Sequence, residues 1–261
     1  KPLLMDEESR TMFKMPAQYM FKDIPESGKK EDYIAYTIEQ MDKHNIERAM
    51  LGIDDHNEIA KEALRRHPDR FFCSLEVNPN NGMDEVRKIV RLHKEFGVKA
   101  ITGFASGLCP QVPYDDKKWY PIYAKCVELD IPFCPCVGVP GPRLPMAPQK
   151  VELLDEVCWF FPELKVVMRH GAEPWEKLAW KLMLKYPNLY YMTSAFAPKH
   201  YPEEIVKFAN SRGADKVMYA GYFPMGLSLD RIFKDMPNVP FKDEVWPKFL
   251  SENARRVFKL D

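Results

Sequence analysis

A histidine ends one of the strands that this sequence predicts, in the segment Met168–Gly171, which reads Met-Arg-His-Gly. The imidazole of His170 could act as a general base or bind a metal ion, because an imidazole changes its protonation near neutral pH. The alternative is structural, with the ring hydrogen-bonded to a neighbouring strand. Arg169 should alternate to the other face of the strand, so we expect it to pair with an acidic side chain of the helical layer.

Other polar side chains stand in predicted loops or at the ends of predicted strands. Arg143, in the proline-rich loop 139–148, could hold a substrate carboxylate. Thr193 ends a strand and could line the same pocket. Asp54 and Asp55 follow the first predicted strand and could face that pocket, although the pattern favours a cap for the helix that begins near residue 57.

Seven short β-type runs, each followed by a helix-type run, must position these side chains. Their starts lie about 23–34 residues apart, roughly the length of one strand, one loop and one helix. Strands that alternate with helices pair in parallel. We therefore predict an α/β fold, a (β/α)8 TIM-type barrel, in which the carboxyl ends of the strands form the mouth where chemistry takes place. The runs are Arg48–Ile53, Phe71–Val77, Val98–Phe104, Ile131–Val137, Lys165–Met168, Leu189–Thr193 and Lys216–Tyr219.

Apolar residues at helical spacing predict helices between these runs. Gly97 and Gly213 are expected to end two of the helices, and the prolines of residues 139–148 predict a long ordered loop. The clearest predicted helices are Glu31–His44, Asp84–Phe96, Glu176–Tyr186 and Glu203–Arg212.

The chain divides into an irregular N-terminal arm, residues 1–30, and one barrel domain, residues 31–261. Large apolar side chains fill the arm, and a surface this apolar must be covered. We therefore expect a homo-oligomer, or a hetero-oligomer with a related barrel subunit. The alternative is an arm that folds over the bottom of its own barrel and plugs it. The apolar side chains are Leu3, Leu4, Met5, Met12, Phe13, Met15, Tyr19, Met20 and Phe21.

The overall charge is balanced, with 38 basic and 38 acidic residues, so the composition gives no sign of a nucleic-acid-binding protein. No apolar run approaches the roughly 18 residues of a membrane span, and we expect a cytoplasmic protein that does not bind membranes. The 6 cysteines include no CxxC pair, which indicates reduced, mostly buried thiols and no structural zinc site. No glycine-rich nucleotide-binding motif follows any predicted strand.

Several motifs occur in a fixed order in the second half of the chain. His170–Gly171 precedes Pro174–Trp175, Tyr186–Tyr190 precedes Thr193–Ser194, Gly213–Val217 leads into the last predicted strand, and Phe249–Ala254 follows near the end. Together they resemble the amidohydrolase-related superfamily, in the branch called amidohydrolase 2. The resemblance runs from about residue 31 to the end, and it implies a barrel that acts as a metal-dependent hydrolase or decarboxylase.

The resemblance also implies a metal site that this sequence lacks. Family members use a His-x-His on strand 1, a His on strand 5 and an Asp on the last strand. No His-x-His occurs here, so strand 1 is either upstream of Lys1 or replaced by the arm. Cys136 stands at the position of the strand 5 His, and Tyr222 at that of the Asp. Because a catalytic divalent ion needs at least three protein ligands, we expect no bound metal and no cofactor.

Two interpretations of function follow. The lost ligands favour an accessory or non-catalytic subunit of an amidohydrolase-related enzyme. The alternative is an active hydrolase or decarboxylase-like lyase that acts on a small carboxylate-bearing substrate. In that enzyme His170 is the acid or base, Arg143 orients the carboxylate and Tyr222 donates a proton. In both cases we expect His170, Cys136 and Tyr222 to lie at one mouth of the barrel.

Overall fold

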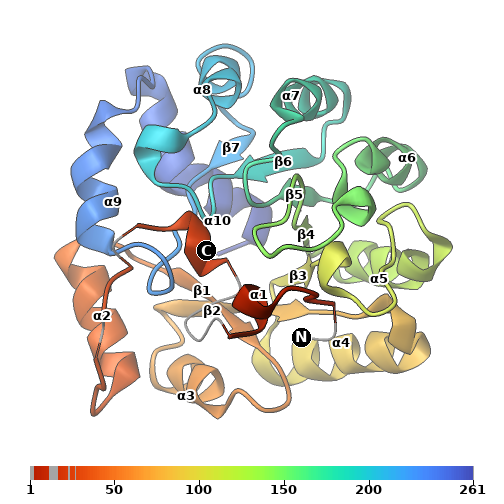
Figure 1. Cartoon of the computed structure of the whole chain (residues 1–261), viewed down its shortest axis with the longest axis horizontal. Helices are drawn as coiled ribbons and strands as arrows, with labels where there is room; N and C mark the ends of the chain where they lie inside the picture. Colours follow the sequence, from red (N-terminus) through yellow and green to blue (C-terminus); the bar gives the residue numbers. More distant parts are fainter. Residues whose placement is uncertain (1–2, 12–16, 23, 27, 261) are drawn as a thin grey trace.

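The fold is a TIM-type α/β barrel, seen here in a computed structural model that describes residues 3–11, 17–22, 24–26 and 28–260. Within these residues seven parallel strands form one curled sheet in sequence order, with helices outside it (Figure 1). Each strand lies inside one predicted run, so the alternation prediction is confirmed. The strands are β1 (Ala49–Ile53), β2 (Phe71–Glu76), β3 (Ala100–Gly103), β4 (Phe133–Pro135), β5 (Val166–Met168), β6 (Leu189–Met192) and β7 (Val217–Met218).

The four clearest predicted helices are also confirmed, as α2 (Tyr33–Lys43), α4 (Met83–Phe96), α7 (Glu176–Lys185) and α8 (Glu203–Ala209). Gly97 ends α4 in the left-handed conformation, with φ at 64°, as expected for a glycine cap. However, α8 already ends at Ala209, and Gly213 closes the turn that follows by donating its N–H to the Phe208 carbonyl, at 2.8 Å. The helices are α1 (Glu7–Thr11), α2 (Tyr33–Lys43), α3 (Glu58–Arg66), α4 (Met83–Phe96), α5 (Tyr120–Leu129), α6 (Leu153–Phe160), α7 (Glu176–Lys185), α8 (Glu203–Ala209), α9 (Leu229–Asp235) and α10 (Asn253–Phe258).

The core lies on both faces of the curled sheet. The outward side chains, such as Ile101, Val166 and Tyr191, pack against the surrounding helices. The inward side chains form a smaller cluster inside the barrel, and α10 closes that cluster at the end where the strands begin. This inner cluster contains Ala100, Cys134, Val167, Met192, Met218, Val257, Phe258 and Leu260.

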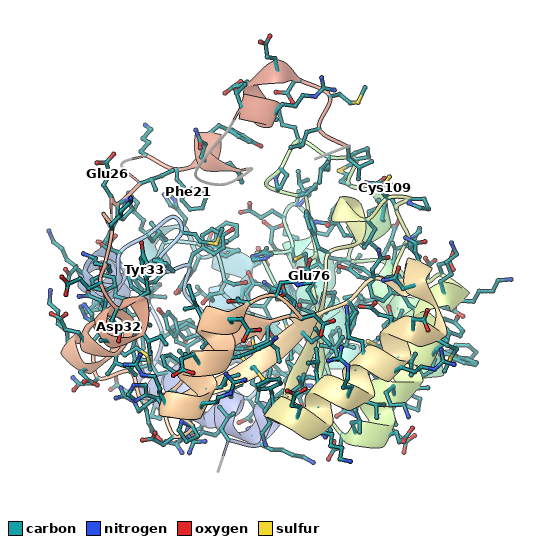
Figure 2. All side chains as sticks on the ribbon, turned by 90° about the horizontal axis from the view of Figure 1, so that it is seen from below. Phe21, Glu26, Asp32, Tyr33, Glu76 and Cys109 are labelled. Carbon is teal, nitrogen blue, oxygen red and sulfur yellow. The ribbon has the colours of Figure 1, made fainter. Side chains whose placement is uncertain are left out.

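The N-terminal arm lies over the opposite end of the barrel, where the strands finish (Figure 2). Arg143 donates to the carboxylates of Asp6 and Glu8, at 2.8 Å each. The Tyr19 hydroxyl donates to the Gly141 carbonyl at 2.6 Å. The alternative that the arm plugs the bottom is therefore wrong, because the C-terminal residues fill that end and the arm is tied to the loop at the mouth.

Part of the arm still exposes apolar side chains. Met5, Tyr19 and Met20 have exposed fractions of 78%, 46% and 59%. Met12, Phe13 and Met15 lie outside the described residues. Association with another subunit therefore stays a prediction.

All six cysteines are free thiols, and all but Cys109 are buried, as the sequence predicted. None of the described helices is long and apolar enough to cross a membrane.

Candidate active site

Strand register places Cys136 and Arg169 next to each other on the inner face of the sheet. Cys134 and Val167 both point into the barrel, and the residues two positions further on face the same way. A parallel bridge joins Cys136 to Arg169, and the Arg169 N–H donates to the Pro135 carbonyl at 2.9 Å. The expectation that Arg169 points to the helical layer is therefore wrong.

His170 leaves the strand conformation immediately afterwards. Its φ is +65°, in the left-handed region that non-glycine residues rarely adopt. Gly171 and Ala172 follow with φ of 91° and 63°, so the chain turns sharply here. A Cβ on Gly171 would lie 2.4 Å from the Phe196 ring, which explains the glycine. Such backbone strain persists only where the surroundings hold it, and it is often found at functional sites.

Ser194 fixes the His170 ring. The His170 N–H donates to the Ser194 hydroxyl oxygen at 3.1 Å, and the same oxygen lies 3.2 Å from the imidazole Nδ1. The Tyr222 ring stands edge-on to the imidazole, with centroids 6.1 Å apart and an angle of 81° between the rings. Ser194 follows β6 and Tyr222 follows β7, so three neighbouring strands contribute to this group.

Burial keeps most of these groups uncharged at neutral pH. Burial, and then the charge of Arg169, lowers the pKa of His170 to about 3. Burial raises the pKa of the Cys136 thiol to about 11 and also raises the pKa of Tyr222. Arg169 is therefore the permanent charge among these four side chains.

Two further residues at the mouth were not found from the sequence. Glu76 is the last residue of β2, and its exposed side chain lies on the side of the barrel that faces the arm (Figure 2). Its charge acts on the pKa of both Arg169 and Cys136. Tyr114 is fully buried, and its hydroxyl lies 2.8 Å from the Gly103 carbonyl and 2.9 Å from the Cys136 carbonyl. Tyr114 thus holds the ends of β3 and β4 together.

The remaining predicted site residues have protein partners in the structure. Thr193 is buried, and its hydroxyl lies 3.3 Å from the Tyr201 hydroxyl and from the Ala220 carbonyl. Asp54 accepts the N–H groups of His56 and Asn57, at 2.6 and 2.7 Å, in the turn before α3. Asn57 itself caps that helix.

Arg143 does bind carboxylates, but those of Asp6 and Glu8 in the chain's own arm. A substrate-binding role for Thr193, Asp54 and Arg143 stays a prediction.

The metal ion that the resemblance implies does not fit the side chains at this mouth. Among the described residues, no group of three or more His, Cys, Asp or Glu side chains could hold a metal ion. The permanent charge of Arg169 lies beside Cys136 and His170 and would repel a divalent cation.

Comparison with known proteins agrees with the fold. The family model Amidohydro_2, described as amidohydrolase, matches residues 8–260. An uncharacterised TIM-barrel protein from Bordetella bronchiseptica is 22% identical, with a TM-score of 0.75 over 87% of this chain and 82% of that one. A 2,6-dihydroxybenzoate decarboxylase from Rhizobium is 18% identical, with a TM-score of 0.67 over 89% of each chain. A 4-oxalomesaconate hydratase from Rhodopseudomonas palustris is 17% identical, with a TM-score of 0.62 over 90% of this chain and 86% of that one.

These similarities to solved structures show a shared barrel fold. The family model extends from the arm to the residues after α10. The chain therefore belongs to the amidohydrolase family, in the group that the Amidohydro_2 model describes.

Proposed function

We propose that this protein is an active, decarboxylase-like lyase that acts on a small carboxylate-bearing compound at the mouth of the barrel. The observation that carries the proposal is the pairing of His170 with Tyr222. One is a neutral imidazole fixed by Ser194, and the other is a phenol that stands edge-on to it at 6.1 Å. An accessory subunit has no need of a strained histidine beside a protonated tyrosine, so this pairing favours the enzyme.

The two side chains have suitable protonation states for proton transfer. His170 is neutral because its pKa is lowered to about 3, so it can accept a proton from a substrate hydroxyl or from water. Its Nδ1 faces Ser194, which leaves Nε2 for the ligand. Tyr222 keeps its proton because its pKa is raised by burial, so it can act as a donor.

Decarboxylation needs a proton donor at this place. The bond between the substrate carbon and its carboxylate breaks, carbon dioxide leaves, and the electron pair stays on the carbon. That carbon then takes a proton, which we assign to the Tyr222 hydroxyl, and solvent returns a proton to the tyrosinate. Two relatives of similar fold are named as a decarboxylase and a hydratase, and both names describe lyase chemistry on carboxylic acids.

The test is a search for turnover with hydroxylated aromatic acids and unsaturated dicarboxylic acids. Turnover is measured as carbon dioxide release and as a change in ultraviolet absorbance. We expect at least one compound to react. His170→Gln and Tyr222→Phe should each lower its rate on the order of 10²- to 10⁴-fold, the usual contribution of a general acid or base.

His67→Gln is the matched control. His67 follows α3 beside the first residue of β2, at the end of the barrel away from the mouth, and the rate should not change. The proposal is wrong if none of the compounds reacts faster with the wild-type protein than with the His170→Gln variant.

A further inference from the structure

We infer that Arg169 is the carboxylate-binding residue of this mouth, and that the protein takes small organic anions whose carboxylate pairs with its guanidinium. This inference rests on the proposed function, and it names the group that holds the substrate.

The backbone on both sides of Arg169 is fixed. Its N–H donates to the Pro135 carbonyl at 2.9 Å, and its carbonyl accepts from the Val137 N–H at 3.1 Å. These two bonds anchor the residue to the end of β4. The side chain leaves the sheet on the inner face, as Val167 does, and it is half-buried, so solvent and a small ligand can still reach it.

The guanidinium has no protein partner in the described part of the chain: neither a hydrogen bond nor an ion pair of its side chain occurs there. Arg70, which is also mostly covered, shows the usual arrangement. It donates to the Asp42 carboxylate and to the carbonyls of Ile46 and Glu47, at 2.7–2.9 Å. Arginine is seldom buried without such partners, because removing its charge from water is costly. A ligand carboxylate would supply the missing partner.

The surroundings of Arg169 favour an anion over a cation. Its neighbours include the Cys136 and Cys134 thiols and the Tyr114 phenol, which carry no charge at neutral pH. His170 is neutral as well. Glu76 is the acidic residue whose charge reaches Arg169, yet the two form no ion pair in the structure. A carboxylate that binds the planar guanidinium through both oxygens therefore gains a charge-assisted pair with little competition.

The experiment compares ligands that differ by one carboxylate. 2,6-Dihydroxybenzoate and 2-hydroxybenzoate are titrated into the full-length protein beside resorcinol and phenol, their carboxylate-free counterparts, by calorimetry and ligand-observed NMR. The wild-type protein should bind each carboxylate on the order of 10- to 100-fold more tightly than its counterpart, as expected for hydrogen bonds to a charged group.

Four substitutions locate the effect. Arg169→Met and Arg169→Gln should both remove the preference for the carboxylate, and circular dichroism should show which of them keeps the native fold. Arg169→Lys keeps the charge and should retain part of the preference. Arg70→Met removes a paired arginine at the start of β2, away from the mouth, and should bind as the wild-type protein does.

The inference is overturned if the wild-type protein shows no saturable binding of either carboxylate at millimolar concentration. It is also overturned if a folded Arg169→Met or Arg169→Gln variant keeps the wild-type preference, since another group would then hold the anion. Its failure is distinct from failure of the lyase proposal. Carboxylate binding that depends on Arg169 but leads to no turnover would support the inference and remove the lyase, whereas turnover with an unchanged KM in the Arg169 variants would do the reverse.

Discussion

Phe21 of the N-terminal arm stacks on Tyr222, with ring centroids 5.6 Å apart and an angle of 15° between the ring planes. Tyr222 is a catalytic residue in our proposal, and its ring also contacts the His170 ring. Gly226 leaves the space that Phe21 occupies, since a Cβ there would lie 2.7 Å from the Phe21 ring. The arm therefore contacts the reacting group directly, and its position should influence access to the mouth.

Arg143→Gln should release the arm while leaving the barrel folded. Arg143 pairs with Asp6 and Glu8, and its guanidinium lies 4.6 Å from the centre of the Tyr19 ring. These contacts are solvent-exposed and add little to global stability, so the melting temperature should hardly change. Trypsin should nevertheless cleave after Arg10 or Lys22 several times faster than in the wild-type protein.

The control for this prediction is Arg87→Gln, which removes an exposed ion pair with Asp84 on α4, on the outside of the barrel. It should leave cleavage of the arm unchanged. Equal cleavage rates in the wild-type and Arg143→Gln proteins would show that the arm does not depend on Arg143.

The seven strands could be predicted because their signals are local. Each run is short and apolar and is separated from the next by one helical segment, and the chain needs no distant contact to reveal this. The direction of Arg169 could not be predicted in the same way. Both faces of this sheet are covered, so its strands are mostly apolar and hydrophobicity does not distinguish the inner side chains from the outer ones.

The sequence pattern also could not predict where the arm lies. Its apolar side chains predicted a segment that must be covered, and in the structure Phe21 contacts Tyr222. Which end of the barrel it contacts depends on pairs such as Asp6 with Arg143 and Phe21 with Tyr222, which are far apart in the chain. The bottom of the barrel was already filled by Phe258 and its neighbours, another long-range contact that includes the Phe72 ring at 5.6 Å.

His170 should make the protein less stable in acid. Its pKa is about 3 in the folded protein, below the ordinary value of 6.5, so between these values the unfolded chain binds more protons than the folded one. The stabilisation is therefore complete above pH 6.5 and is lost as the pH falls towards 3. His170→Gln should flatten the pH dependence of unfolding in this window, which urea unfolding at a series of pH values measures.

NMR titration of the imidazole checks the cause directly. The His170 ring should stay neutral down to pH 5. It should therefore keep its ability to accept a proton in the reaction over the same range. A titration midpoint near 6.5 would mean that the ring is solvated and would remove the basis of the stability argument.

The purified protein should hold far less than one zinc, iron or manganese ion per chain after dialysis against a chelator. The family resemblance puts Cys136 and Tyr222 at the expected positions of two metal ligands, and the Cys136 thiol would have to lose a proton despite a pKa of about 11. Elemental analysis by mass spectrometry measures this. A content close to one ion per chain would contradict the prediction and would point to ligands beyond the described residues.

Arg169→Met should leave the unliganded protein at least as stable as the wild type. The unpaired guanidinium is partly desolvated at the mouth without a compensating carboxylate, and replacing such a charge by an apolar side chain of similar length is often neutral or stabilising. Arg70→Met should instead destabilise the protein, on the order of 1–3 kcal/mol, because it removes hydrogen bonds to Asp42 and to two carbonyls. Thermal and urea unfolding of both variants, without ligand, separate the two cases. If Arg169→Met lowers stability as much as Arg70→Met does, Arg169 is a structural residue that has a protein partner in solution. If Arg169→Met is at least as stable as the wild type, Arg169 is a residue kept for binding at a cost in stability.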